Sequence, residues 1–459
     1  MTGLIECNWV QSYSWTPPAG TVSGFFIAKL TKLSGGDIGK QSYMIFVVRD
    51  DSRTSDFLFQ SAVTTYQAYN TYPGPIPDTT GWRTGRSLYP VAYGNTLPGS
   101  FPGQSAEDRQ GREVSFNRPY FEATNPTEPE AKAIYSSAGQ FFEFEYNMVR
   151  WMEREGYDVT YQTDIDTHEL PATLAPGKHK AFLSVGHDEY WTWKMRRNVE
   201  VARDDPDNPT HLAFFGGNTA QWQIRLKPSS STSIPANADN RTIICYKQHW
   251  RDLGTTPGVG DPNFKNNALG VMNDNYTITT VWRDNQNTDV TGCTNDPSPD
   301  CNCPSGTPNC TRKPEDELIG VMTKLNNRIT GIFNFNIDSL TCPPWIKSGI
   351  PNTMLTLENL VGYEADTFFN NYGRNVRIVS RVLLQASPPV ESNAVFFKVN
   401  QAKVFAIGST HWSNGVDDFG QTEAYRFRIW KPLRYNVNAV ILTRNVLNCF
   451  NGTNMERCD

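Results

Sequence analysis

Four continuous apolar runs, each ending in polar residues, constrain the fold of this chain most strongly. They are YMIFVVRDD from residue 43, YDVTYQTDID from 157, HKAFLSVGHDE from 179 and HLAFFGGN from 211. Strands that are apolar along their whole length are buried on both faces, as in a parallel sheet. Helical patterns at about 140–156 and 189–203 separate the last three runs. The sequence therefore predicts an open, mainly parallel, doubly wound α/β sheet with right-handed crossovers.

Three parts of the chain surround or form this predicted sheet. Residues 1–42 alternate apolar and polar positions, which indicates a small N-terminal β element. Residues 43–235 form the α/β domain, and an insert at about 64–135, rich in Tyr, Pro, Gly and Asn, is expected across its top. Residues 236–459 are expected to be mostly β, with a Cys-rich loop at 293–310 and a short helix near 438–448.

Composition argues against two classes of partner. Charged residues make up 19% of the 459 residues and the formal net charge is −5, without a basic run, so nucleic acid is not expected to bind. No apolar stretch approaches the ~20 residues that a membrane-spanning helix needs.

The cysteines and the N-glycosylation sequons favour a secreted glycoprotein. The nine cysteines include a group in a Pro-rich and Asn-rich segment, namely Cys293, Cys301, Cys303 and Cys310. Their spacing lacks paired C-x-x-C units, so it favours disulfides over zinc, and an odd total leaves one thiol free or paired between chains. Sequons begin at Asn240, Asn275, Asn309 and Asn451. The stretch MTGLIECNWVQSYSW shows no signal peptide, so export would require a leader that has been removed.

Polar side chains follow all four apolar runs: 49–51, 164–166, 187–190 and 216–218. Each group alone could simply end a strand or cap a helix. Together they predict a ligand site, because ligands of open α/β sheets bind at the carboxyl ends of the strands. The turn after 186 has no Ser or Cys nucleophile, and neither H-E-x-x-H nor a P-loop occurs, which leaves acyl-enzyme, zinc-peptidase and P-loop chemistry unsupported. Tyr190 is expected in the first turn of a helix, where the helix dipole would favour a phenolate.

Six sequence blocks resemble the N,N-dimethylformamidase large (beta) subunit-like family between about residues 20 and 425. They are IFVVRDDSRTSDFLFQ, VSFNRPY, EYNMVRWMEREGYDVTYQTDIDTHE, FLSVGHDEYW, LAFFGGN and VFAIGSTHWSNGVDD. The resemblance implies an α/β domain similar to the class I glutamine amidotransferase fold. It also implies a single iron held by two Tyr phenolates and one Glu.

The resemblance assigns candidate site residues by motif. Tyr190 of GHDEYW and Tyr146 of EYNMVRW would be the phenolate ligands of the metal. The stretch MNDNYTITTVWRD, where the ligand Glu is expected, contains no Glu. Asp274 is therefore taken as the third metal ligand, with Asp417, Asp418 and Glu189 as alternative carboxylates. The catalytic candidates are His187, Glu189 and Asp417, and the substrate-binding candidates are Asn218, His411 and Trp412.

Two functions remain open at this point. The first is a secreted, iron-dependent amidase-like hydrolase of the C–N bond of a small amide, in which the ferric ion polarises the carbonyl and activates water. The second is a non-catalytic extracellular protein on the same fold, with a degenerate metal site, that binds a glycan or assembles with copies of itself. Convergence of the Tyr146 and Tyr190 hydroxyls beside a carboxylate would favour the first.

Overall fold

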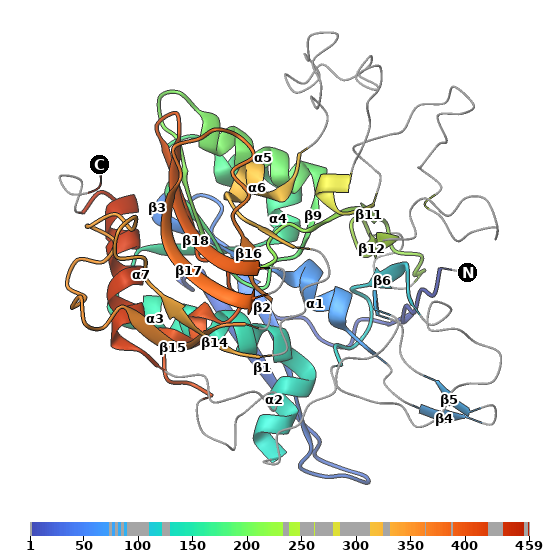
Figure 1. Cartoon of the computed structure of the whole chain (residues 1–459). Coiled ribbons are helices and arrows are strands. Elements are labelled where there is room, and N and C mark those ends of the chain that lie inside the picture. Colours follow the sequence, from blue (N-terminus) through green and yellow to red (C-terminus); the bar gives the residue numbers. More distant parts are fainter. Residues whose placement is uncertain are drawn as a thin grey trace, which may run out of the picture.

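A large mixed sheet with helices on both faces forms the centre of the molecule (Figure 1). The computed structural model describes residues 2–72, 76–78, 81–83, 87–89, 110–121, 129–232, 238–247, 261, 279–284, 313–324, 331–362, 364–386, 389–420, 435–453 and 458. The predicted α/β class is confirmed as a mixed α/β fold with additional strands.

The central sheet has seven strands in the order β17-β18-β19-β10-β8-β3-β7. Their bounds are β3 Ser55–Ser61, β7 Val159–Thr163, β8 His179–Gly186, β10 His211–Gly216, β17 Arg377–Ala386, β18 Pro389–Val399 and β19 Ala402–Ala406. The five strands from β19 to β7 are parallel, whereas β17 and β18 add an antiparallel hairpin at one edge. Three predicted strands, at 158–163, 181–186 and 211–215, are confirmed in the parallel part, and β3 lies between the first two.

Alternating side chains of the parallel strands fill two separate cores, one on each face of the sheet. In β8, Leu183 and Val185 join the core beneath α3 (Tyr146–Glu155) and α7 (Val437–Phe450). Phe182 points the other way and packs with Met195 and Val199 of α5 (Trp193–Asp204). Burial on both faces explains why the strand sequences are continuously apolar.

The predicted helices are present, with corrections at their ends. The one at 140–156 is built from α2 (Pro129–Gln140), a π-helical segment η2 (Phe141–Glu145) and α3, which ends at Gly156 with φ of 76°. The helix near 438–448 is confirmed as α7. The helix expected from 189 begins instead at Trp193, because the Thr192 hydroxyl caps it by accepting from the Met195 N–H. Tyr190 therefore does not lie in a helical turn; it opens the short strand β9 (Tyr190–Thr192).

A second, four-stranded sheet continues from the carboxyl end of β8. Its order is β6-β12-β11-β9, with bounds β6 Glu113–Ser115, β12 Thr242–Ile244 and β11 Trp222–Lys227. Helix α1 (Val63–Tyr69) packs against it in a third apolar cluster that contains Tyr69, Tyr190 and Trp222. The remaining elements are β4 Ile76–Asp78, β5 Gly81–Arg83, α4 Asp164–Glu169, η3 Pro171–Leu174, η6 Trp282–Asp284, α6 Glu315–Ile319, β13 Met322–Thr323, β14 Phe333–Asn336, β15 Thr356–Val361, β16 Asp366–Thr367 and η9 Trp412–Gly415.

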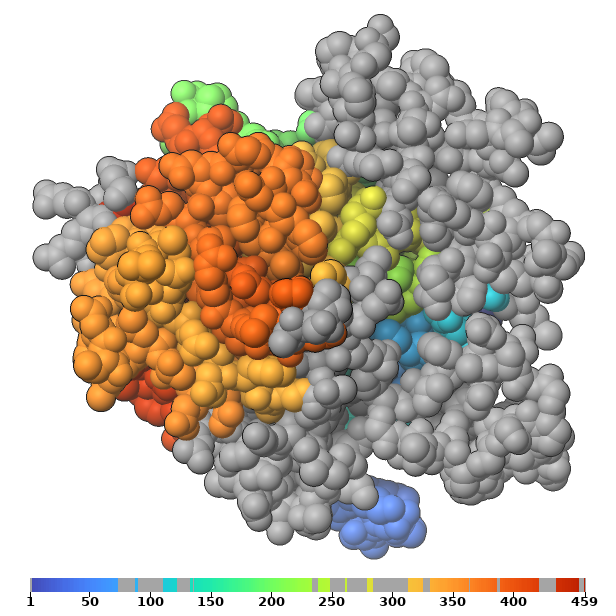
Figure 2. Space-filling model, viewed as in Figure 1, coloured from blue at the N-terminus to red at the C-terminus, as the bar shows by residue number. Residues whose placement is uncertain are grey.

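Residues 43–49 do not join the parallel sheet, so that prediction was wrong. They form β2 (Gln41–Val48), which pairs antiparallel with β1 (Gly24–Thr31) in a hairpin whose tip stands out from the described chain in Figure 2. One face of the hairpin packs on the core, whereas apolar side chains of the other face stay partly exposed, Met44 at 53% and Phe46 at 37%. Ile45 and Val47 pack against the central core, while Phe46 on the other face contacts Trp15 with ring centroids 5.5 Å apart.

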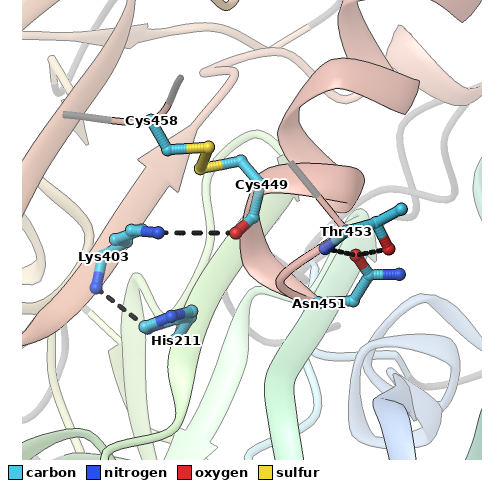
Figure 3. Close-up of a disulfide and its surroundings, with 6 residues drawn as sticks. All are labelled: His211, Lys403, Cys449, Asn451, Thr453 and Cys458. Carbon is cyan, nitrogen blue, oxygen red and sulfur yellow. Dashed lines mark hydrogen bonds between the residues drawn. A yellow bond between two sulfur atoms is a disulfide. The ribbon is translucent and has the colours of Figure 1, made fainter. Parts of the chain in front are cut away.

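One disulfide lies in the described part of the chain. It joins Cys449, at the end of α7, to Cys458, and the Cys449 carbonyl accepts from the Lys403 ammonium on β19 (Figure 3). The predicted disulfides within 293–310 fall outside the described residues, as do the sequons at Asn275 and Asn309.

Among the described helices, none combines the length and the apolar character needed to cross a bilayer. The predicted domain boundaries stay predictions, although the central sheet takes strands from both sides of residue 236.

Candidate active site

The turn between β8 and β9 carries a buried histidine and a buried glutamate. Gly186 ends β8 with φ of 72°, and a Cβ there would lie 2.5 Å from the Phe144 Cβ, so only glycine fits. The next residues place His187 Nε2 3.2 Å from Glu189 Oε2. His187 and Glu189 are both buried, at 1% and 2% exposure. The sharp turn thus directs two ionisable groups to the same point.

A second glutamate, Glu364, completes this cluster from the far end of the sequence. Its Oε2 lies 2.8 Å from His187 Nε2, and its side chain is 15% exposed, more than either residue of the turn. The Asn218 amide donates to Glu364 Oε2 at 2.9 Å. Asn218 has φ of 57°, and the Asp366 carboxylate accepts from its backbone N–H. Asn218 therefore holds Glu364 at the histidine.

Two tyrosine hydroxyls contact Glu189, and a third contacts one of these two. The Tyr69 and Tyr89 hydroxyls lie 3.1 Å and 3.0 Å from Glu189 Oε2 and 2.8 Å from each other. The Tyr190 hydroxyl donates to the Tyr89 hydroxyl at 2.8 Å. The other carboxylate oxygen of Glu189 accepts from the Trp222 indole N–H at 2.8 Å. Glu189 is consequently surrounded by phenols and one indole.

The buried Lys247 ammonium lies among the same aromatic rings. It is 3.4 Å from the centroid of the Tyr89 ring, 4.7 Å from that of Trp222 and 5.1 Å from that of Tyr190. A cation over aromatic faces at these distances is attracted to them, most strongly where water is excluded. Its positive charge also stabilises the ionised form of Glu189.

Charges within the cluster outweigh the effect of burial on two of its groups. Burial lowers the pKa of His187, but the carboxylates of Glu364 and Glu189 overcome this and raise it to about 10. Burial raises the pKa of Glu189, but His187 and Lys247 together bring it below its ordinary value. Burial and the nearby Glu189 charge raise the pKa of the Tyr89 and Tyr190 phenols well above the usual range. An imidazolium between two carboxylates, flanked by neutral phenols, is the resulting charge pattern.

This donor set suits a hard metal ion. Glu189, Glu364 and, in its neutral form, His187 each offer one ligand atom, all within 4.8 Å of one another. The Tyr69 and Tyr89 hydroxyls offer two further oxygens against the same Glu189 atom. Two phenol oxygens and one carboxylate match the ligand types that the family resemblance implies for iron, and a cation would reverse the tendency of buried phenols to stay protonated. The residues therefore fit the implied metal.

Four of the residues predicted from sequence meet in this cluster: His187, Glu189, Tyr190 and Asn218. Tyr146 lies in an aromatic cluster instead, with its ring centroid 4.9 Å from that of Phe142 and 4.8 Å from that of Phe419. Because apolar contacts occupy its ring, the packing does not support its predicted role as a metal ligand. Asp274 falls outside the described residues.

The predicted residues of the HWSNGVDD block lie elsewhere. Asp417 is fully buried, with its carboxylate 3.2 Å from an Arg150 nitrogen and 2.8 Å from an Arg154 nitrogen of α3. Trp412 donates its indole N–H to the Thr443 hydroxyl of α7 at 3.0 Å and belongs to the core. Asp417 therefore pairs with arginines of α3, and Trp412 packs in the core against α7, rather than beside His187.

His411 of that block is linked to the cluster through one aromatic ring. Its ring stacks on the Phe144 ring with centroids 6.3 Å apart, and Phe144 in turn meets the edge of the His187 ring at 5.5 Å. One phenyl ring thus separates the two histidines.

Sequence reasoning missed Tyr69, Tyr89, Lys247 and Glu364. The two tyrosines belong to the Tyr-rich insert, where the composition was noted but no single position stood out. Glu364 lies in VGYEADTF, directly after β15, so an acidic residue after an apolar strand was the available signal.

Comparison with known families supports the resemblance. The profile of the family described as N,N-dimethylformamidase beta subunit-like, C-terminal, matches residues 1–425. The chain belongs to this family. No curated protein sequence matched the chain. The N,N-dimethylformamidase beta subunit-like match covers every described residue of the cluster around His187 and stops before α7, which starts at Val437.

Proposed function

We propose that the chain is a metal-dependent hydrolase of small amides, with its active site at His187, Glu189 and Glu364. Membership of the N,N-dimethylformamidase beta subunit-like family supports amide C–N hydrolysis as the reaction class. The observation that carries the metal dependence is the meeting of the Tyr69 and Tyr89 hydroxyls at one oxygen of Glu189. A carboxylate among converged tyrosines also counts against a degenerate site.

Tyr69, Tyr89 and Glu189 are the residues we assign as holders of the metal, which by family resemblance would be iron. An ion bound there supplies Lewis acidity, which polarises an amide carbonyl and lowers the pKa of water. This assignment replaces Tyr146 and Asp274 with residues that the fold brings together. Tyr190 then supports Tyr89 through its hydroxyl rather than serving as a ligand itself.

Proton transfer falls to His187 and Glu364. Glu364 is the more exposed of the two acids that contact His187, and its contact with His187 gives a route for a proton between the two groups. Amide hydrolysis requires one proton to leave the attacking water and one to reach the leaving amine, and a positioned acid–base pair contributes typically 10²–10⁴-fold to such steps. Asn218 keeps Glu364 oriented while its charge changes.

Two further proposals concern the fold and the compartment. The five parallel strands with helices on both faces support the proposed likeness to the class I glutamine amidotransferase fold. The Cys449–Cys458 disulfide supports the proposed export, since disulfides persist in oxidising compartments and are rare in the cytosol.

Metal content and amide hydrolysis of the purified full chain test the function. We expect about one iron per chain, the colour of a ferric phenolate, and release of an amine from N,N-dimethylformamide or a related small amide. Glu189→Gln should lose both the iron and the activity. Asp417→Asn changes an equally buried carboxyl outside the cluster and should keep the iron. A colourless, iron-free and inactive wild-type protein would remove the proposal.

A further inference from the structure

Helix α1 presents Tyr69 to the candidate site but has no cap of its own. It is only seven residues long, the residue before it is Ala62, and its first turn contains no acidic residue. Isolated helices shorter than ~12 residues are marginal in water, so such a helix depends on its surroundings. Its free N-terminal N–H groups must be satisfied by groups from elsewhere in the fold.

Two buried acids from other elements meet that requirement. Glu145, the last residue of the π-helical segment, accepts from the Ala62 N–H at 3.2 Å and from the Tyr66 hydroxyl. Asp164, the first residue of α4, accepts from the Thr64 N–H at 2.9 Å. Glu145 is 1% exposed and Asp164 is fully buried. In the described part of the chain, the second oxygen of each acid has no hydrogen-bond partner.

The C-terminal end of α1 is held by a buried base. Arg118, at 2% exposure, donates to the carbonyls of Gln67 and Asn70 at 3.3 Å and 3.1 Å. Side chains from other parts of the fold thus hold α1 at both ends.

Between these ends, α1 contacts the site directly. The Thr65 hydroxyl accepts from the Glu189 N–H at 2.9 Å, and the Thr64 hydroxyl donates to the Tyr190 carbonyl at 2.7 Å. At the last position, the Tyr69 hydroxyl reaches Glu189 Oε2. A shift of α1 along its axis would therefore change the distance between Tyr69 and Glu189.

We propose that Glu145 and Asp164 are positioning residues that clamp α1 and so fix the Tyr69 hydroxyl against Glu189. The clamp deepens the proposed function and rests on it, since it assumes that Tyr69 and Glu189 hold iron. Residues that orient ligands are worth typically 10–100-fold in metal affinity or activity.

The chemistry of Glu145 gives the inference a specific test. Burial raises its pKa to about 8, and the groups facing it are Tyr66 from α1, Asp188 from the β8 turn, Asp164 from α4 and the Ser61 hydroxyl. Glu145 is then neutral at pH 7, and an amide oxygen can accept the same two hydrogen bonds. Glutamine should replace it, whereas alanine should not.

The rate at which a chelator removes iron from the full-length protein at pH 7 is the measurement. Glu145→Ala and Asp164→Ala should lose iron at least about tenfold faster than wild type. Glu145→Gln should restore the wild-type rate. Tyr66→Phe removes only one hydrogen bond of the clamp and covers the case in which the alanine variants do not fold; it should speed iron loss to a smaller extent. Glu153→Ala serves as the matched control, because it breaks a Tyr–Glu hydrogen bond of 2.6 Å, to Tyr161, outside the clamp.

The possible outcomes distinguish failure of the clamp from failure of the proposed function. Iron-loaded wild type with clamp variants that lose iron no faster than Glu153→Ala would overturn the clamp and leave the function intact. Glu145→Gln behaving like Glu145→Ala would also overturn it. Iron-free, inactive wild type would remove both the proposed function and the clamp.

Discussion

The turns after β8 and after β19 start alike. Both strands pair with β10, and both turns have a glycine with positive φ, at 72° for Gly186 and 65° for Gly408. A histidine, a tryptophan and an acid follow each glycine in the sequence: His187, Trp191 and Glu189 after Gly186, and His411, Trp412 and Asp417 after Gly408. The sequence analysis assigned residues of both turns to one site, but only the first turn contributes side chains to the cluster of His187, Glu189 and Glu364.

The difference lies in what the neighbouring elements present to each turn. Tyrosines of α1 and of the insert, together with Glu364, meet the first turn. Apolar rings and the arginines of α3 meet the second, so Trp412 and Asp417 are occupied by packing and ion pairing. Two sequences of similar chemistry thus acquire different roles from their partners, which a single sequence does not display.

Replacing each histidine with glutamine should show the largest difference in activity between the two turns. His187→Gln should lower kcat for amide hydrolysis by roughly 10²–10⁴-fold, because the proton route to Glu364 is lost. His411→Gln, on the far side of the Phe144 ring, should change kcat by less than about threefold. Steady-state kinetics with a small amide would measure both. Equal losses in the two variants would place both turns in the site.

Trp412→Ala should separate stability from activity in the second turn. Removing a buried Trp from a core costs about 3–5 kcal/mol of unfolding free energy. The variant should unfold at lower denaturant concentration yet keep the KM of the wild type wherever it remains folded. Chemical denaturation and kinetics at low temperature give the two readings. A raised KM would instead assign Trp412 to the substrate site.

The acid beneath the first turn should make stability depend on pH. Since the pKa of Glu145 is raised from 4.5 to about 8, the folded state keeps a proton that the unfolded state loses between these values. The contribution of the Glu145 carboxyl to the free energy of unfolding is complete below about pH 4.5. It is lost as the pH rises to 8, by up to about 1.4 kcal/mol per pH unit. Denaturation of wild type and Glu145→Gln from pH 5 to 9 would compare the slopes. Parallel curves for the two proteins would contradict this origin.

Asn218→Gly should have the smallest effect of these changes. It tests whether Glu364 needs the hydrogen bond from Asn218 to act with the first turn. Glycine keeps the positive φ of this position but removes the hydrogen bond to Glu364. A hydrogen bond to a charged group is worth about 1.5–3 kcal/mol, so kcat/KM should fall by about 10- to 150-fold. Thermal denaturation checks that the fold is retained. Unchanged kcat/KM would mean that Glu364 needs no such support.

The sequence predicted the parallel part of the sheet because burial on both faces leaves a continuous apolar run. It misplaced 43–49 because β2 carries apolar side chains on both faces although its outer face, with Met44 and Phe46, is partly exposed. The less apolar β3, which contains Gln60, was overlooked. The strand-end rule selected His187, Glu189 and Asn218, which the fold brings together in the candidate site. Tyr69, Tyr89 and Glu364 come from an insert and from the far end of the chain, so only the tertiary fold reveals that they meet.

The strand order of the central sheet has a consequence for synthesis of the chain. Strand β10 lies between β8 and β19, and the chain from residue 217 to residue 401 must be made before β19 can pair. At about 5–20 residues per second, that interval is on the order of 10–40 s. During it, one edge of β10 lacks its permanent neighbour, and exposed strand edges invite pairing with other chains. Slower synthesis or added chaperone should therefore increase the yield of folded full-length protein. The increase should be larger than for a protein whose sheet is built from consecutive strands.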